Sequence, residues 1–169
     1  LIILAAFSDV QPNRTAADIT NQSNSQIVPF YRDMSHGKVY PSADVYGWIT
    51  LPNTRAYYGA DTNGFLDSGI ADQVSPFSWR IAYDAVYGAA YRGLNMSQYK
   101  SLVVMHSGDG QESTSNTNTD NVWSATYNIG PPAGPFNDYS IVPETEHMQN
   151  GAHLSPLGVW AHELGINLF

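Results

Sequence analysis

The chain has 169 residues, no cysteine, and a net charge of −8 from 7 Lys and Arg against 15 Asp and Glu. This length suits a single domain, and the acidic balance argues against nucleic-acid binding, which draws on basic side chains. No apolar run reaches the ~18 residues of a membrane helix, so no membrane span is predicted. Charged residues make up 13%, against roughly 25% in an average soluble domain. With many Asn, Ser, Thr and Tyr residues, this composition is typical of a secreted, extracellular protein.

The first half of the chain predicts a buried strand, a helix and then further strands. Residues 1–7 are continuously apolar, which suits a strand buried on both faces. Apolar residues recur at helical spacing within residues 27–34, and Gly37 is a plausible helix end. Residues 38–51 are rich in β-branched and aromatic side chains and predict one or two strands. We expect residues 55–69 to form a loop.

The second half predicts two strong helices, over residues 78–92 and 157–168. A central strand is expected at residues 101–105, and further strands at 122–129 and 139–142. Strands that alternate with helices in this order predict an α/β (α+β) fold with a mixed sheet.

The strongest chemical motif is the pair His162-Glu163, which lies within the second predicted helix. In the zinc-protease motif H-E-x-x-H, two His residues at i and i+4 hold zinc and the Glu activates the metal-bound water. In this chain Ile166 occupies the position of the second His. From the pattern alone, an isolated His-Glu pair on a helix is more often an ordinary surface pair than a zinc site.

Several segments, taken together and in order, resemble the M6 family of secreted metallopeptidases, the immune inhibitor A type. The segments are LAAFSD (4–9), FYRDMSHGK (30–38), VYGWITLP (45–52), RAYYGAD (55–61), VVMHSGDGQE (103–112), YSIVPE (139–144) and GVWAHELG (158–165).

The resemblance implies a zincin-like mixed β-sheet with a backing helix and an active-site helix. On this basis residues 1–169 form the N-terminal subdomain of a single M6-peptidase-like domain and lack the C-terminal subdomain. Family members are exported zinc endopeptidases that often carry structural calcium. His162 matches the first zinc ligand and Glu163 the catalytic general base, whereas Ile166 falls where the family has its second His and Phe169 where it has a Gly.

Two functions are therefore open. The first is an exported zinc-dependent endopeptidase that cleaves a protein or peptide substrate through a metal-activated water. The second is a catalytically inactive, protease-like scaffold in an extracellular or cell-surface assembly. Ile166 favours the second, because one imidazole cannot approach the ~10–16 kcal/mol of a four-ligand zinc site. Either the missing C-terminal part of the domain or a partner chain is expected to cover apolar residues of the last helix: Leu157, Trp160, Leu164 and Leu168.

Other residues could hold metal ions. His147 and His153 precede the last helix and could join His162 in a zinc site. Asp61, Asn63 and Asp67 present oxygens at alternating positions, as calcium loops do. An Asx-type turn without an ion is the alternative for this second group.

Surface features complete the expectations. Asn13, Asn21 and Asn95 begin N-glycosylation sequons. Tyr83, Tyr87 and Tyr91 recur every four residues, which predicts a helix face packed on the sheet, whereas Tyr57-Tyr58 is the better candidate for contact with a ligand or partner.

Overall fold

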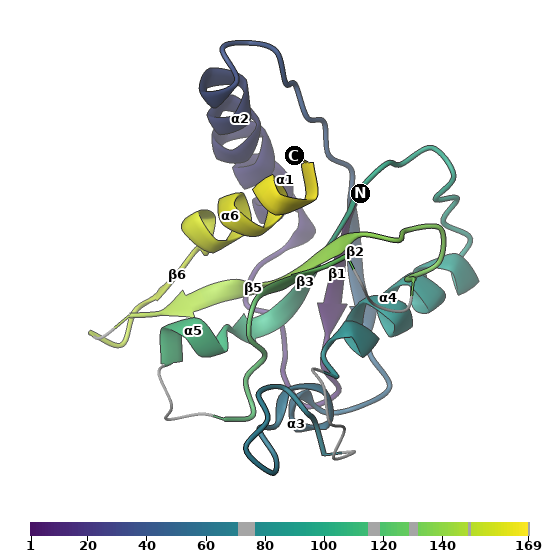
Figure 1. Ribbon diagram of the computed structural model, residues 1–169, viewed down its shortest axis with the longest axis vertical. Coiled ribbons are helices and arrows are strands. Elements are labelled where there is room, and N and C mark those ends of the chain that lie inside the picture. The colour runs from purple at the N-terminus through teal and green to yellow at the C-terminus, as the bar shows by residue number, and fades with distance from the viewer. Residues whose placement is uncertain (71–76, 115–118, 129–131, 149, 169) are drawn as a thin grey trace.

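A computed structural model describes residues 1–70, 77–114, 119–128, 132–148 and 150–168. These residues form a six-stranded mixed sheet with helices on both faces (Figure 1). The strands are β1 (Ile2–Ala6), β2 (Val45–Thr50), β3 (Leu102–Asp109), β4 (Ala125–Tyr127), β5 (Tyr139–His147) and β6 (His153–Leu154). Their order is β2-β1-β3-β5-β4, with β6 paired to β5. The first four strands of that order are parallel, whereas β4 and β6 run antiparallel to β5. The predicted mixed α/β sheet is confirmed.

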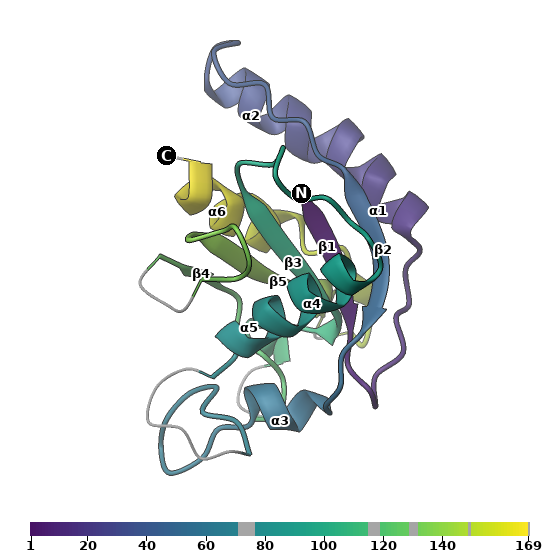
Figure 2. The same ribbon diagram turned by 90° about the vertical axis from the view of Figure 1, so that its right-hand side faces the viewer.

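Two helical layers enclose the sheet (Figure 2). One face carries α1 (Ala16–Gln22), a π-helical turn η1 (Ser23–Ile27), α2 (Val28–Met34) and α6 (Leu157–Leu168). The other face carries α4 (Trp79–Tyr91). Two short helices, α3 (Arg55–Gly59) and α5 (Gln111–Thr114), follow β2 and β3. No helix in the described part of the chain is long and apolar enough to cross a membrane.

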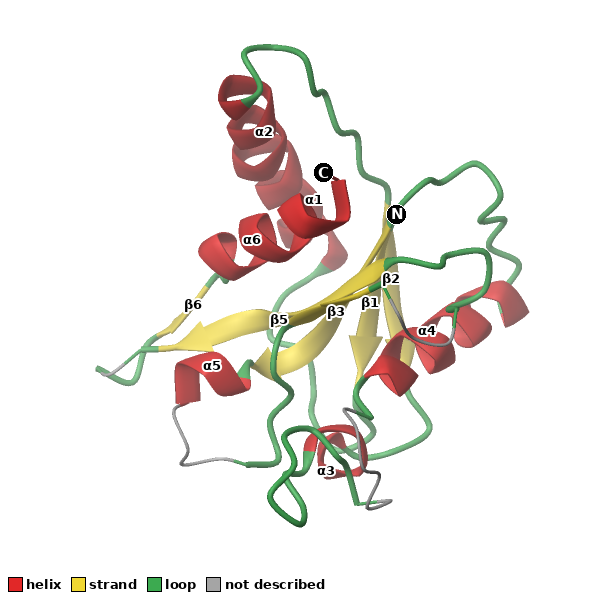
Figure 3. Cartoon of the chain, in the orientation of Figure 1, coloured by secondary structure: helices red, strands yellow, loops and turns green. Residues whose placement is uncertain are grey.

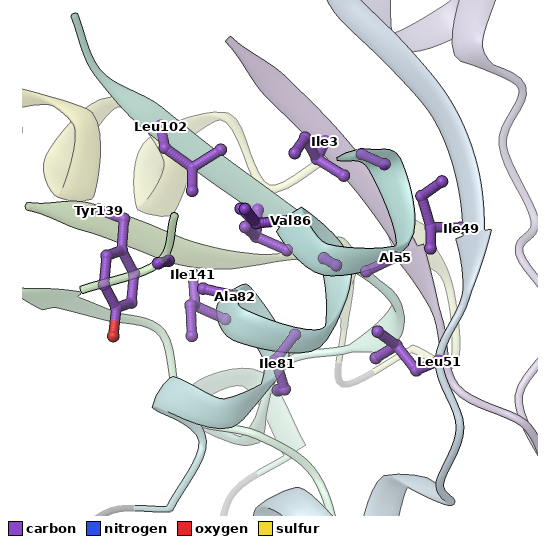
Figure 4. Packing of buried hydrophobic residues seen from close by; sticks show 14 of the residues in the cluster. Ile3, Ala5, Ile49, Leu51, Ile81, Ala82, Val86, Leu102, Tyr139 and Ile141 are labelled. Carbon is purple, nitrogen blue, oxygen red and sulfur yellow. The ribbon is translucent and has the colours of Figure 1, made fainter. Parts of the chain in front are cut away.

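The alternation of side chains along each strand divides the core into two halves. In β1, Ile3 and Ala5 pack with α4 (Figure 4), whereas Ile2 and Leu4 face α1, η1 and α6. Neighbouring β3 follows the same rule, and its Leu102 lies in the α4 half of the core. Because side chains alternate with period two, a strand between two helical layers must be apolar at every position. This explains the uninterrupted apolar run at the start of the chain.

A buried carboxylate joins the segment before α1 to the centre of the sheet. Glu144, on β5, is fully buried. It accepts backbone N–H bonds from Asn13 (3.0 Å), Arg14 (3.0 Å) and Gly108 (2.8 Å). The guanidinium of Arg14 returns a bond to the Glu144 carbonyl at 3.1 Å. Burial raises the pKa of Glu144, and the three N–H bonds and Arg14 oppose that shift. Beyond this anchor α1 begins with a capping box between Thr15 and Asp18.

The secondary structure differs from expectation in several places. The predicted helix around residues 27–34 is longer, because α1, η1 and α2 run on without a break from residue 16. Residues 38–51 hold one strand, β2. The expectation of a loop throughout residues 55–69 is wrong, because Thr54 caps the short helix α3 by accepting from the Tyr57 N–H. The predicted strand at 122–129 shortens to β4, and its last residue, 129, lies outside the described residues.

The tyrosine face of α4 is a further correction. Ile81, Ala85 and Ala89 are fully buried against the sheet, whereas Tyr87 and Tyr91 are 69% and 89% exposed. The helix is therefore rotated by about one residue from the predicted orientation. Small aliphatic side chains let α4 approach the sheet closely, and the phenol rings remain in water.

The Glu144 anchor predicts a stability effect. Glu144→Gln replaces one acceptor oxygen by an NH₂ group that faces backbone N–H donors, so buried donors lose their partner. We expect a loss of about 1–3 kcal/mol in the free energy of unfolding, measured by urea denaturation. Glu146→Gln is the matched control: it changes a half-buried Glu two residues along β5 and should cost under about 0.5 kcal/mol. Equal effects of the two substitutions would contradict this account of the anchor.

Candidate functional site

His162 and Glu163 lie at the wall of a hollow between α6 and the edge of the sheet. The hollow measures about 360 Å³, and we call it the α6 hollow. Its lining comprises Glu112, Trp123, Ser124, Gly158, Val159, His162 and Glu163. His162 is exposed, whereas the Glu163 side chain is buried, with 7% exposure. The motif residues therefore border one concave site.

Apolar packing and hydrogen bonds to neighbouring elements together set the position of α6. Trp160 is fully buried in the core half that contains α1 and η1. The Tyr31 hydroxyl of α2 donates to the carbonyl of Ala161. On the side of the sheet, the Ser140 hydroxyl donates to the Glu163 carbonyl at 3.0 Å. These contacts hold the helix against β4 and β5, and Figure 3 shows α6 over β5.

A hydrogen bond from the sheet also orients the Glu163 carboxylate. Thr126 Oγ1, on β4, lies 2.7 Å from Glu163 Oε2 and 3.0 Å from the Glu163 carbonyl oxygen. A hydroxyl donor to a carboxylate is a charge-assisted hydrogen bond, which is stronger than a neutral one. Glu163 is thus fixed beside the hollow instead of moving freely in solvent.

The donors described around His162 do not fit a zinc ion. In the described ranges of the chain, His162 belongs to no group of three His, Cys, Asp or Glu side chains close enough to share a metal. Ile166, one turn further along α6, is 51% exposed and offers only carbon. A zinc-protease site needs three protein ligands, and α6 supplies one imidazole.

A second cluster contains the two other His residues singled out from the sequence. Asp109, His147 and His153 each offer one ligand atom, and these atoms lie within 4.8 Å of one another. His153 Nδ1 is 2.9 Å from Asp109 Oδ1. The structure thus brings His147 and His153 together, but with Asp109 in place of the expected His162. Sequence reasoning missed this pairing, although Asp109 and His147 are the last residues of β3 and β5, two parallel strands whose carboxyl ends lie side by side.

The loop expected to bind calcium is closed by its own hydrogen bonds. Asp61 accepts from the Asp67 N–H at 2.9 Å through Oδ1 and from the Gln111 side chain at 2.7 Å through Oδ2. Asp67 is buried and accepts from the Trp123 N–H and the Ser78 hydroxyl. Both Asp carboxylates are therefore engaged by donors of the protein itself.

Within that loop three positions adopt a left-handed backbone: Asn63 (φ 50°), Gly64 (φ 78°) and Asp67 (φ 49°). Asn, Asp and Gly are the residue types that tolerate this conformation best. Calcium binding here stays a prediction.

Other surface predictions have mixed outcomes. Asn13, Asn21 and Asn95 are all exposed, as an attached glycan requires, and their glycosylation stays a prediction.

Tyr58 is fully buried and donates to Asp84, so the expected ligand contact there is wrong for this residue. Trp160 is buried, and it needs no partner chain to cover it.

Comparisons of the chain with models of known protein families and with curated proteins found no match. The M6 resemblance therefore depends on the ordered sequence segments alone.

Asp67 predicts a pH dependence of stability. Burial, together with the nearby Asp61 and Glu112, raises its pKa from about 3.8 to about 8, against weaker opposition from hydrogen bonds. Between these values the folded protein holds a proton that the unfolded chain has lost. Stability should therefore fall as pH rises through this range, by up to about 1.4 kcal/mol per pH unit. Asp67→Asn should remove this contribution.

The check is urea unfolding of the wild type and Asp67→Asn at several pH values between about 5 and 8. As pH rises, we expect the unfolding free energy of the wild type to fall relative to that of Asp67→Asn. A difference that is constant with pH would contradict the assignment to Asp67.

The Thr126–Glu163 bond predicts a second stability effect. Thr126→Val keeps the shape of the side chain but removes the hydroxyl that meets the buried carboxylate. We expect a loss of about 1–3 kcal/mol in the free energy of unfolding, whereas Thr126→Ser should retain most of it because the hydroxyl remains. Thermal and urea unfolding of the two variants provide the test, and a Val variant as stable as the Ser variant would rule out this role.

Proposed function

We propose that this chain is an exported, zincin-like peptidase domain of the M6 type that takes an extended polypeptide at the α6 hollow and hydrolyses it with Glu163 as general base, although α6 does not complete the zinc site of the family. The observation that carries the proposal is that His162 and Glu163, singled out by motif, border one hollow at the edge of a mixed sheet. The ordered resemblance to the family supports it, and the low share of charged residues supports export.

Glu163 is the residue proposed to act as general base. Its Oε2 is held by the Thr126 hydroxyl at 2.7 Å, and its side chain contributes to the wall of the hollow. A carboxylate fixed in this way is placed to take a proton from a water molecule that attacks a bound peptide carbonyl. Such proton transfer by a positioned side chain typically contributes 10²–10⁴-fold to the rate.

The edge of the sheet supports an extended polypeptide as the substrate. Among the strands that the structure describes, β4 ends the sheet beyond β5. Extended peptides commonly bind by adding a strand to such an edge. Trp123, two residues before β4, is 42% exposed and lines the hollow. Exposed Trp side chains are frequent anchors for bound polypeptides.

Ile166 favours a second candidate function, a scaffold that binds polypeptide without cleaving it. Its side chain offers no metal donor where the resemblance expects an imidazole, and among the described residues His162 belongs to no group of three potential metal ligands. In this alternative the α6 hollow and β4 form a recognition surface within an extracellular assembly. The two candidates share the ligand class and differ in hydrolysis.

The test compares cleavage of fluorogenic denatured casein by the wild type and Glu163→Gln, with added Zn²⁺. Gln keeps the oxygen that accepts from Thr126 but cannot take a proton. We expect kcat/KM to fall by about 10²–10⁴-fold, with the melting temperature unchanged within a few degrees. Glu146→Gln, whose side chain lies outside the lining of the hollow, is the matched control and should leave cleavage intact.

The outcomes separate the two candidates. Casein cleavage by the wild type that persists in Glu163→Gln would rule out the proposed base. If the wild type does not cleave casein but binds it, and Trp123→Ala weakens that binding, the scaffold function is correct. If it neither cleaves nor binds casein, both proposals fail.

A further inference from the structure

We propose that Asp109, His147 and His153 form a binding site for one divalent first-row transition-metal ion of the Zn²⁺ type. The site is separate from His162 and does not depend on the proposed peptidase function. It lies where β3 and β5 end and where β6 returns along β5 (Figure 1).

Strand pairing places the three side chains together. His147 and His153 are direct partners in the antiparallel pairing of β5 with β6. Asp109 is the partner of Thr145 in the parallel pairing of β3 with β5. Each metal-binding side chain is therefore carried by a strand whose backbone is hydrogen-bonded to the neighbouring strand. This arrangement limits the conformational entropy lost when an ion binds.

The distances suit a metal ion. One ligand atom from each residue lies within 4.8 Å of the other two. Zn–N and Zn–O bonds of about 2.0–2.2 Å at tetrahedral angles put two ligand atoms about 3.3–3.6 Å apart, so side-chain rotations that bring the more distant atoms about 1 Å closer would close the site. The His153 Nδ1 to Asp109 Oδ1 contact, 2.9 Å long, is a hydrogen bond that an ion would replace.

An ordinary ion pair accounts for only part of this cluster. His153 and Asp109 satisfy each other as a pair. That pair does not explain why His147 offers a nitrogen to the same point, with its ring 5.2 Å from that of His153. Three donors that converge from three strands are the arrangement that a metal ion requires.

Neighbouring groups support the ligands. The Thr145 hydroxyl donates to Asp109 Oδ1 at 2.7 Å. A hydrogen bond of this kind orients the carboxylate ligand of a metal site, and its loss typically costs 10–100-fold in metal affinity. The backbone N–H of His147 donates to the Ser113 hydroxyl at 2.9 Å and so fixes the backbone that carries this imidazole. Thr145 is buried, so its hydroxyl holds the carboxylate from within the protein.

The donor set selects the class of ion. Two imidazoles and one carboxylate suit Zn²⁺ and related first-row ions, whereas Ca²⁺ and Mg²⁺ prefer oxygen ligands throughout. The His153 side chain is 52% exposed, so solvent reaches the cluster and a water molecule can complete four-fold coordination. Three protein ligands and one open position are typical of zinc sites that are not purely structural.

The experiment is a Zn²⁺ titration of the intact chain by isothermal calorimetry. The wild type should bind one ion per cluster, and His147→Ala, His153→Ala and Asp109→Asn should each weaken this binding by more than about tenfold. Thr145→Val should weaken it by about 10–100-fold. His36→Ala is the matched control, because it removes an exposed His that belongs to no metal-binding group among the described residues, and His162→Ala tests whether α6 holds an ion instead.

A thermal melt with and without Zn²⁺ guards against loss of folding in the variants. Zn²⁺ should raise the melting temperature of the wild type and of His162→Ala but not that of His153→Gln. Absence of binding in the wild type would overturn the proposal. So would binding that survives His153→Ala and disappears in His162→Ala, because the ion would then be held by α6. Neither result bears on the Glu163 cleavage test.

Discussion

Burial of the parallel strands on both faces is the constraint on which the rest of the structure depends. Along β1 and the first part of β3 every side chain is buried, so polar side chains with exposed functions are confined to the strand ends. In parallel sheets the carboxyl ends of neighbouring strands meet at one edge, where ligands commonly bind. Asp109, Glu144 and His147 all lie toward that edge. Glu144 anchors the segment before α1, whereas Asp109 and His147 belong to the proposed metal site.

Helix α6 combines a buried and a functional side in one element. Trp160 is fully buried, and three residues later Glu163 has its carboxylate at the wall of the α6 hollow. The Thr126 and Ser140 hydroxyls satisfy polar groups that would otherwise be costly to bury. The proposed general base therefore depends on β4 and β5 for its position, and substitutions in these strands are expected to affect the hollow as well as the core.

Local patterns in the sequence predicted the main layers. The apolar run of β1 and the helical spacing of α4 and α6 are local signals, and all three elements are confirmed. The orientation of α4 was wrong because tyrosines count as apolar in a periodic pattern, although the smaller Ile81 and Ala85 fit closer to the sheet. Helix α3 was missed because five residues are too few to show a helical period.

The long-range contacts could not be predicted from local patterns. Glu144 receives N–H bonds from residues 130 and 131 positions earlier, and no spacing rule connects such distant segments. His147 and His153 were predicted as metal ligands from residue type and proximity, but their partner Asp109 becomes visible only once β3 and β5 are paired in register. The pairing of strands, more than any motif, determines which titratable side chains meet.

The most direct measurement is anomalous X-ray diffraction at the zinc absorption edge from crystals of the chain grown with Zn²⁺. The account predicts an anomalous peak between Asp109, His147 and His153, with no peak of comparable height at His162, where α6 supplies one imidazole. A peak at His162 with none at the three-residue cluster would contradict it. Such a result would show that α6 holds the ion despite Ile166, and that the strand-end cluster is an ordinary hydrogen-bonded pair with a neighbouring ring.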